Sequence, residues 1–363
     1  MLPVFPALWH IIRIDSAAQN GVYLMKVLLI GGTGTISSAI TALAAEKGME
    51  LVLFNRGTRL SLFPGGLPKN VSVICGDIHN EAFASVLLQG IEFDAVVDFI
   101  AFDTKDLERD FRLFRGKTRQ FIFISTASAY QKPPASPFLT ESTPLCNPFW
   151  EYSRKKIAGE EYLMNCYRTH GFPVTIVRPS HTYSDRSMPV AIHGKHGSWS
   201  TLKRILDGKE VIIPGDGTSL WTLTHNTDFA KAFVGLLGNI HAIGNAYHIT
   251  SDESLTWNQI YECIGLALHR PIHAVHIPTD ALARSNPDYA GTLLGDKANT
   301  VLFDNSKIRR LVPDYTATVR FDEGARRIAA WVLSHPEVQT PDPDFDAWTD
   351  DMLAKYHTFY DAL

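Results

Sequence analysis

The chain of 363 residues contains few cysteines and no apolar run long enough to cross a bilayer, which takes about 20 residues. Cys75, Cys146, Cys166 and Cys263 include no pair at C-x-x-C spacing, which excludes a zinc knuckle or dithiol redox motif of that form. Scattered thiols of this kind suit a reducing compartment. We therefore expect a cytoplasmic protein with no membrane partner.

An excess of positive charge is also missing. The chain has 34 Lys and Arg against 38 Asp and Glu, a net charge of -4. Nucleic acids recruit clustered cations, so we expect no nucleic-acid partner. Hydrophobic residues make up 45% of the chain, as in ordinary globular proteins, and the length predicts a large domain with an appended lobe, or two domains.

Short apolar runs alternate with helical patterns through the first half of the chain. Strands are predicted at residues 26–30, 51–54, 71–75, 95–98, 120–125 and 173–177. Helices are predicted at residues 36–47, 81–88, 104–114 and 151–170. This alternation predicts an α/β fold, with a doubly wound parallel sheet over residues 25–180. Residues 1–24 form an extension of unknown role.

Beyond residue 180 the segments become shorter. Helices are predicted at residues 200–207, 227–237, 257–268, 321–333 and 347–360, and a strand at 272–277. Residues 184–198 are rich in Pro, Gly and His and predict a loop over the substrate. We expect residues 181–363 to form a smaller lobe at the carboxyl ends of the strands, with some segments returning to the first domain.

A glycine-rich turn follows the first predicted strand. Gly31, Gly34 and Ser37 stand at G-x-x-G-x-x-S spacing directly before a helix. Glycines let the backbone approach a pyrophosphate, and the N–H groups of the helix point at the anion. The turn predicts a Rossmann-type dinucleotide site made by Gly31, Gly32, Thr33, Gly34, Thr35 and Ile36.

The second strand ends at Asn55 and Arg56, where an NAD enzyme usually has an acid that binds the ribose hydroxyls. A cation attracts a 2′-phosphate, so Arg56, helped by Arg59, favours NADP slightly over NAD. A solvated loop residue is the alternative interpretation of Arg56. Asp77, after the third strand, is expected to contact the adenine amino group together with Ile78. A turn-capping aspartate is the alternative interpretation of Asp77.

Tyr152 and Lys156 stand four residues apart in a predicted helix, so both side chains lie on one face. An ammonium beside a phenol favours the phenolate and lowers the pKa of the tyrosine. A tyrosine activated in this way can take a proton from an alcohol. The pair therefore predicts alcohol–ketone chemistry.

The order of these motifs resembles the extended short-chain dehydrogenase/reductases, and within them the NAD-dependent epimerase/dehydratase family. The matching elements are the glycine turn, Asp77, Ser125-Thr126, Tyr152-x-x-x-Lys156, Arg178-Pro179 and His225-x-x-Asp228. The resemblance implies that Tyr152 exchanges a proton with the substrate and that Thr126 binds the same oxygen. It implies that Lys156 also binds the nicotinamide ribose, and that Ser125 and Pro179 contact the cofactor.

Two departures from the family pattern narrow the chemistry. Family dehydratases carry Asp-Glu after the catalytic threonine, where this chain has Ala127-Ser128, which disfavours water elimination. Family epimerases grip a diphosphate with an arginine where this chain has Trp221. Either Arg204 or Arg309 replaces that cation, or the substrate is not a nucleoside diphosphate sugar.

The remaining candidates concern the substrate side. His181 stands where the family has asparagine and is expected to contact substrate or the cofactor amide, with a structural role as the alternative. His193 and His196 lack a nearby carboxylate or cysteine at ligand spacing, so no metal site is expected. His225 and Asp228 are expected to fix the junction with the lobe.

The sequence thus predicts a nicotinamide-dependent epimerase or oxidoreductase acting on a sugar or sugar nucleotide. An NADP-dependent carbonyl reductase with a non-nucleotide substrate is the alternative, and epimerisation is slightly favoured over net redox. A non-catalytic RNA-binding relative is less favoured, because Tyr152, Lys156 and Thr126 are all present. The family resemblance also implies a possible homodimer.

Overall fold

The computed structural model describes residues 24–57 and 66–362. Residues 1–23 of the expected extension, and Arg59, lie outside the described residues. Within the described ranges, no helix has both the length and the apolar character that crossing a membrane requires.

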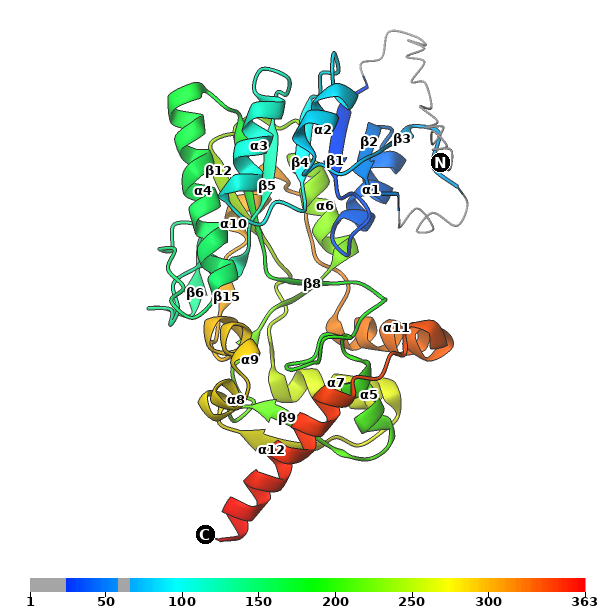
Figure 1. The fold of residues 1–363 in the computed structure, drawn as a ribbon, viewed down its shortest axis with the longest axis vertical. Coiled ribbons are helices and arrows are strands. Elements are labelled where there is room, and N and C mark those ends of the chain that lie inside the picture. Colours follow the sequence, from blue (N-terminus) through cyan, green and yellow to red (C-terminus); the bar gives the residue numbers. More distant parts are fainter. Residues whose placement is uncertain (1–23, 58–65, 363) are drawn as a thin grey trace, which may run out of the picture.

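Seven parallel strands form the central sheet, in the order β12-β7-β5-β4-β1-β2-β3 (Figure 1). Their bounds are β1 Lys26–Ile30, β2 Glu50–Asn55, β3 Val71–Cys75, β4 Ala95–Asp98, β5 Phe121–Ile124, β7 Val174–Pro179 and β12 Asn245–Ile249. The order reverses between β1 and β4, because the chain builds outward to β3 and then returns to the other side of β1. In such sheets a crevice for ligands opens at the carboxyl ends of the strands at this reversal.

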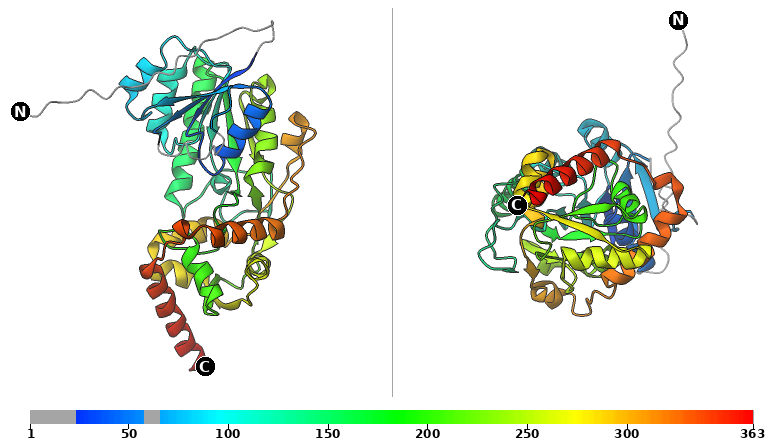
Figure 2. Two further views of the ribbon diagram at one scale, coloured as in Figure 1. Left: turned by 90° about the vertical axis from the view of Figure 1, so that its right-hand side faces the viewer. Right: turned by 90° about the horizontal axis from the view of Figure 1, so that it is seen from below.

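Helices cover both faces of the sheet, and alternate residues of each strand divide between two cores. Val27 and Leu29 of β1 pack in one core, and Leu28 and Ile30 pack in the other. The first core is covered by α1 Ser37–Glu46, α6 Asn226–Leu236 and α10 Ser306–Leu311. The second core is covered by α2 Glu81–Leu87, α3 Thr104–Phe114 and α4 Glu151–His170. Figure 2 shows the helices on opposite sides of the strands. The predicted doubly wound α/β fold is confirmed.

A second body of structure lies beyond the carboxyl ends of the strands and has its own apolar core (Figure 1). Its larger helices are α5 Trp199–Leu206, α7 Trp257–Leu268, α11 Phe321–Ser334 and α12 Pro343–Asp361. Its paired parallel strands are β9 Glu210–Pro214 and β14 His273–Ile277. Two short helices, α8 Thr279–Ser285 and α9 Pro287–Thr292, lead into a π-helical turn at Leu293–Lys297.

Short elements join the two bodies. The paired strands are β6 Phe138–Leu139 with β15 Leu302–Phe303, β8 His181–Tyr183 with β11 Leu223–His225, and β10 Leu220–Trp221 with β13 Leu255–Thr256. Single 3-10 turns occur at Ala127–Ala129, Ile240–Ala242 and Pro336–Val338. β8 follows β7 directly, carries the chain from the sheet into the lobe and pairs with β11.

The sequence-based prediction missed the seventh strand. β12 lies at the edge of the sheet beside β7, and its segment mixes Asn, Tyr and His with few aliphatic residues. Only its last three residues are buried, so it lacks the continuous apolar run of the central strands. Its place in the sheet depends on α6, which precedes it and packs against α1.

Candidate active site

The glycine-rich turn lies at the carboxyl end of β1, where the strand order reverses. Gly31 has a φ of 80°, and a Cβ there would lie 2.7 Å from Cγ2 of Ile100. The Ser37 hydroxyl accepts a hydrogen bond from the Gly34 N–H and donates one to the Gly31 carbonyl, each at 2.7 Å. Ser37, expected only to fit where the family has glycine, therefore holds the turn closed.

A pocket of about 380 Å³ opens beside this turn. Its lining includes seven of the predicted cofactor residues: Gly31, Thr33, Gly34, Asn55, Arg56, Asp77 and Ile78. Gly57, which follows Arg56, also lines it. The Nδ2 atom of Asn55 is buried and has no hydrogen-bond partner in the described part of the chain. A buried donor without a partner is costly. A ribose hydroxyl or phosphate oxygen would satisfy it, so the residues present fit a dinucleotide.

The other predicted residues of the turn support its shape. Gly32 faces the core, since a Cβ there would lie 2.8 Å from Cδ2 of Leu53. The carbonyl of Thr35 accepts a hydrogen bond from Asn226 at the start of α6, at 2.8 Å. Ile36 directly precedes α1. The helix from the second half of the chain thus braces the cofactor turn.

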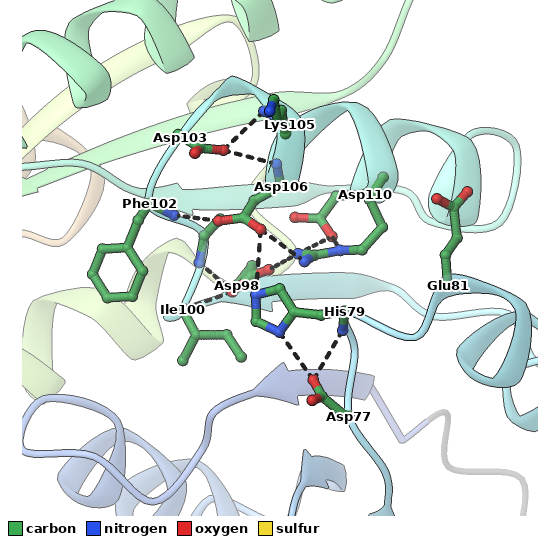
Figure 3. A network of polar contacts seen from close by, with 12 residues as sticks. Asp77, His79, Glu81, Asp98, Ile100, Phe102, Asp103, Lys105, Asp106 and Asp110 are labelled. Atoms are coloured by element: carbon green, nitrogen blue, oxygen red, sulfur yellow. Dashed lines mark hydrogen bonds and ion pairs between the residues drawn. The ribbon is translucent and has the colours of Figure 1, made fainter.

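Asp77 is already engaged by its own loop. Its carboxylate accepts hydrogen bonds from the backbone and the ring of His79, at 3.0 and 2.9 Å, and the backbone bond above all lowers the pKa of Asp77 (Figure 3). The other ring nitrogen of His79 lies 3.4 Å from Asp106. Asp77 therefore serves as the turn cap that was its alternative interpretation, while it also lines the pocket.

A buried charge cluster supports the loop after β4. Asp98 accepts hydrogen bonds from the backbone N–H groups of Ile100 and Ala101, at 2.6 and 2.9 Å (Figure 3). Arg109 of α3 contacts Asp98, Asp106 and Asp110 at 2.8 to 3.0 Å. Burial and then the neighbouring Asp98 raise the pKa of Asp110 well above its ordinary value. One guanidinium thus anchors three carboxyl groups and fixes the loop.

Lys156 contacts this loop from the other side. Its ammonium donates to the backbone carbonyls of Ala101 and Ile124, at 2.7 and 2.8 Å. Gly159, one turn further along α4, lets the helix approach so closely, because a Cβ there would lie 2.7 Å from Leu107 of α3. Burial lowers the pKa of Lys156 to about 8, although Asp98, Asp106 and Glu160 oppose the shift.

Tyr152 lies on the first turn of α4, at the mouth of the crevice. Burial raises the pKa of its hydroxyl, and a hydrogen bond with Thr126 opposes the shift. The Nζ of Lys156 lies 5.7 Å from the centre of the tyrosine ring. The pKa of Tyr152 is therefore raised, chiefly by desolvation, where a lowering by Lys156 was expected. The Lys156 ammonium is instead engaged by two backbone carbonyls.

Thr126 follows β5 and is 9% exposed. Its hydroxyl lies 2.9 Å from that of Ser128, which in turn lies 2.7 Å from the hydroxyl of Ser153. Sequence reasoning did not single out these two serines, although Ser128 follows Thr126 by two residues and Ser153 follows Tyr152 directly. They hold the hydroxyl of Thr126 in position beside the tyrosine.

A pocket of about 280 Å³ lies beside Tyr152 and Thr126. Pro179, His181 and Asp296 also line it. Asp296 comes from the π-helical turn, a kind of distortion that is frequent at functional sites. Burial raises the pKa of its carboxyl group, and Lys132 and Lys297 oppose the shift. Sequence reasoning missed Asp296, since no short motif links it to Tyr152.

The comparisons with known proteins fit this geometry. A model of the NAD dependent epimerase/dehydratase family matches residues 27–250. The chain belongs to this family. It is an NAD(P)-dependent enzyme of the extended short-chain dehydrogenase/reductase type, as the motifs predicted.

The curated relatives of the enzyme have different activities. It is 26% identical to the 2'-dehydrokanamycin reductase of Streptomyces kanamyceticus, over 80% of each chain. It is 29% identical to the UDP-glucose 4-epimerase of Streptomyces lividans, over 70% of this chain and 84% of the relative. It is 25% identical to the Arabidopsis thaliana chloroplast stem-loop binding protein of 41 kDa b, over 64% of this chain and 60% of the relative.

Solved structures share the fold. The epimerase Mth375 of Methanothermobacter thermautotrophicus superposes with a TM-score of 0.68 at 19% identity, over 87% of this chain and 94% of the other. The UDP-glucuronic acid 4-epimerase of Bacillus cereus, solved with UDP-glucuronic acid and NAD, has a TM-score of 0.68 at 20% identity, over 85% and 99%.

Ser125, which follows β5, was predicted to contact the cofactor, but its hydroxyl has another partner in the structure. Ser125 is buried, and its hydroxyl donates to Glu160, which also binds Arg178 through two guanidinium nitrogens. The hydroxyl of Ser125 therefore belongs to a buried network that ties α4 to β7.

The predicted substrate residues are only partly brought together. The ring of His181 lines the pocket with its centre 4.6 Å from that of the buried Trp221. Although His181 is open to the pocket, the surrounding protein lowers its pKa, first by desolvation and then through Lys297 and His193. Its imidazole is therefore neutral near pH 7.

The two arginines offered as replacements for the family cation lie elsewhere. Arg204 donates to the carbonyl of Glu210 and pairs with Asp350 at 2.7 Å, inside the lobe. Arg309 of α10 pairs with Asp252 in the loop between β12 and β13. Neither arginine lines the pocket beside Tyr152.

His225 and Asp228 lie where the sheet and lobe meet. The ring of His225 contacts Thr227 and Asp185, at 2.7 and 3.0 Å. Asp228 accepts hydrogen bonds from the backbone of Thr318 and Val319, at 2.9 and 2.8 Å. Both side chains are thus occupied in joining segments. Among the described residues, no group of three His, Cys, Asp or Glu side chains could hold a metal ion.

Proposed function

We propose that the enzyme interconverts a secondary alcohol and a ketone on a sugar or sugar-like substrate that carries no nucleoside diphosphate. One observation carries this proposal. Tyr152, Thr126 and Lys156 converge at the carboxyl edge of the sheet, with the glycine-turn pocket on one side and the pocket lined by His181 and Asp296 on the other.

Each of the three side chains has a role that its contacts support. The Tyr152 hydroxyl moves a proton to or from the substrate oxygen, and the Thr126 hydroxyl, held by Ser128, orients that oxygen. Two of the three ammonium hydrogens of Lys156 are bound by carbonyls, which leaves one for a ribose hydroxyl. When bound, the nicotinamide cofactor supplies or accepts the hydride, which no protein side chain can do.

The charge of the catalytic pocket argues against a nucleoside diphosphate. Its lining contains the carboxyl group of Asp296 and no Arg or Lys. Trp221 is buried behind His181 and cannot neutralise a diphosphate, and Arg204 and Arg309 have acidic partners elsewhere. A phosphate group in the pocket would meet a carboxyl group and no cation from the lining.

Net reduction is the direction that we favour over epimerisation. The similarity to a 2'-dehydrokanamycin reductase spans 80% of each chain, which supports a redox reaction whose cofactor leaves after each turnover. NADPH is the reductant we propose, because Arg56 is exposed at the rim of the adenosine side of the site. The homodimer implied by the family resemblance remains a prediction.

The nucleotide content of the purified enzyme tests this direction. After denaturation, the released nucleotide is identified and counted per chain. Little bound nucleotide, with turnover of a ketosugar when NADPH is added, is the expected result. Tightly held NAD at about one per chain, with conversion of UDP-glucose to UDP-galactose, would instead establish a nucleotide-sugar epimerase and overturn the proposal.

A further inference from the structure

A third cavity, of about 330 Å³, lies in the lobe and is not used by the proposed chemistry. We name it the lobe pocket. Its lining comes from the loop before α5, from α9 and the π-helical turn, and from the start of α12. The lining includes His193, Tyr289, Lys297, Asp288, Asp344 and Trp348.

The lobe pocket adjoins the catalytic pocket across a thin wall. Asp296 lines the catalytic pocket and the next residue, Lys297, lines the lobe pocket. The Lys297 ammonium lies 5.7 Å from the centre of the Trp221 ring, and the tilted ring of His181 in the catalytic pocket lies 4.6 Å from the same indole, centre to centre. His193 and Lys297 are both near enough to His181 to lower its pKa. The two pockets are therefore close neighbours, separated by the side chains of Lys297 and Trp221.

Aromatic side chains form one side of the lobe pocket. The rings of Tyr289 and Trp348 meet edge to face with centres 4.9 Å apart, and Phe345 lies 6.1 Å from Trp348. Aromatic faces of this kind pack against sugar rings and attract ammonium groups.

Two of the carboxylates that line the pocket are free. Asp288 and Asp344 make no side-chain hydrogen bond or ion pair with the described part of the chain. Asp342, in contrast, already accepts hydrogen bonds from the backbone of His196 and Phe345, at 3.2 and 3.1 Å.

The cations of the lining do not balance these carboxylates. The ammonium of Lys297 is buried and donates to the carbonyl of Ala191 at 2.6 Å. Burial lowers the pKa of Lys297 to about 8, so the side chain keeps most of its positive charge near pH 7. Lys195 is the exposed cation of the lining. The three carboxylates Asp288, Asp342 and Asp344 outnumber the two cations Lys195 and Lys297 by one, and this excess suits a cationic ligand and disfavours an anionic one.

We infer that the lobe pocket binds an amine-bearing sugar ring, linked to the ring whose carbinol or ketone reacts beside Tyr152. The inference deepens the proposed function, on which it rests for the position of the reacting ring. Tyr289 and Trp348 would contact the ring of the ligand, and Asp288 and Asp344 would accept hydrogen bonds from its ammonium group.

Binding of disaccharides to the full chain tests this inference by calorimetry, with NADP present. The probes are a glucosamine disaccharide with two free amines, its N,N'-diacetylated form, and UDP-glucose. We expect the free-amine disaccharide to bind about tenfold more tightly than the acetylated one, and UDP-glucose to bind more weakly than either. Equal affinities of the two disaccharides, or tightest binding of UDP-glucose, would overturn the inference.

Variants of the residues that line the lobe pocket show which side chains cause the preference for free amines. Asp288→Asn with Asp344→Asn should weaken binding of the free-amine disaccharide about fivefold and leave the acetylated form unchanged. Lys195→Gln, the matched control of opposite charge, should leave binding unchanged or strengthen it. An unchanged affinity of the double variant, with its thermal unfolding intact, would contradict this assignment.

Tyr152→Phe separates this inference from the proposed function. It should bind the disaccharides like the wild type, because binding in the lobe does not depend on proton transfer. If the enzyme turned over no ketosugar yet kept the amine preference, the proposed function would fail and the lobe pocket assignment would stand.

Discussion

The ammonium of Lys156 lies 2.7 Å from the backbone carbonyl of Ala101, in the loop that Asp98 holds by its N–H groups. The lysine on α4 is thus joined to the charge cluster that Arg109 organises on α3. The catalytic helix and the cofactor side of the crevice share this loop. Contacts remote from the reacting atoms therefore fix the position of Lys156.

Activity should fall as the pH rises through about 8, because burial lowers the pKa of Lys156 to about 8. Below that pH the side chain is an ammonium that can bind a ribose hydroxyl. Above it the charge is lost. The measurement is the pH profile of kcat/KM. Lys156→Met should abolish turnover, while Lys155→Met, which loses an exposed pair with Glu151, should keep the wild-type profile. If kcat/KM of the wild type did not fall as the pH rose through about 8, the role assigned to Lys156 would be wrong.

Tyr152→Phe should lower kcat by a factor of about 10² to 10⁴, the usual contribution of a positioned proton-transfer group. Binding of NADPH should change little, since the ring remains. The control is Tyr167→Phe, which lies about four turns further along the same helix and is absent from the pocket lining. Turnover of Tyr152→Phe at the wild-type rate would remove the tyrosine from the mechanism.

Arg56→Ala should weaken NADPH binding about tenfold and leave NADH binding nearly unchanged, because an exposed guanidinium contributes mainly through charge on a 2′-phosphate. The measurement is the dissociation constant of each cofactor from fluorescence titration. An equal loss for the two cofactors, or a loss for NADH alone, would reverse the proposed preference.

Arg109→Leu should destabilise the fold by about 3–5 kcal/mol, because it leaves Asp98 buried without its cation. Urea unfolding gives the free energy of unfolding. Arg112→Leu is the matched control on α3, since its pair with Glu81 is exposed and its loss should matter little. Similar stabilities of the two variants would show that the buried cluster does not support the fold.

Asp110→Asn should stabilise the enzyme at pH 7 relative to the wild type by about 1 kcal/mol or more. Burial raises the pKa of Asp110 in the folded chain. Above the ordinary carboxyl pKa of about 4, the unfolded chain has released this proton, so folding must take it up again, and this uptake costs free energy. This cost grows as pH rises from that value toward the folded pKa. An amide carries no such cost and can still accept from Arg109 and donate toward Asp98.

The check on Asp110→Asn is urea unfolding at pH 4.5 and pH 7. The advantage of the variant should be larger at pH 7. A constant difference between the two pH values would mean that Asp110 titrates normally.

Local signals in the sequence account for the Rossmann-type domain. The apolar run of β1, the glycine turn before α1 and the four-residue spacing of Tyr152 and Lys156 are encoded by neighbouring residues, because strand burial, turn geometry and helix periodicity act over a few positions. These signals sufficed to predict the family and the enzyme class.

Tertiary structure alone decided the environment of those residues. Asp296 approaches Tyr152 from a π-helical turn far along the chain, and β12 joins the sheet only because α6 packs on α1. The raised pKa of Tyr152 and the lowered pKa of Lys156 follow from burial, which depends on every element packed around them. Local pattern determines which side chains a segment presents, whereas long-range packing determines their neighbours, solvent exposure and charge.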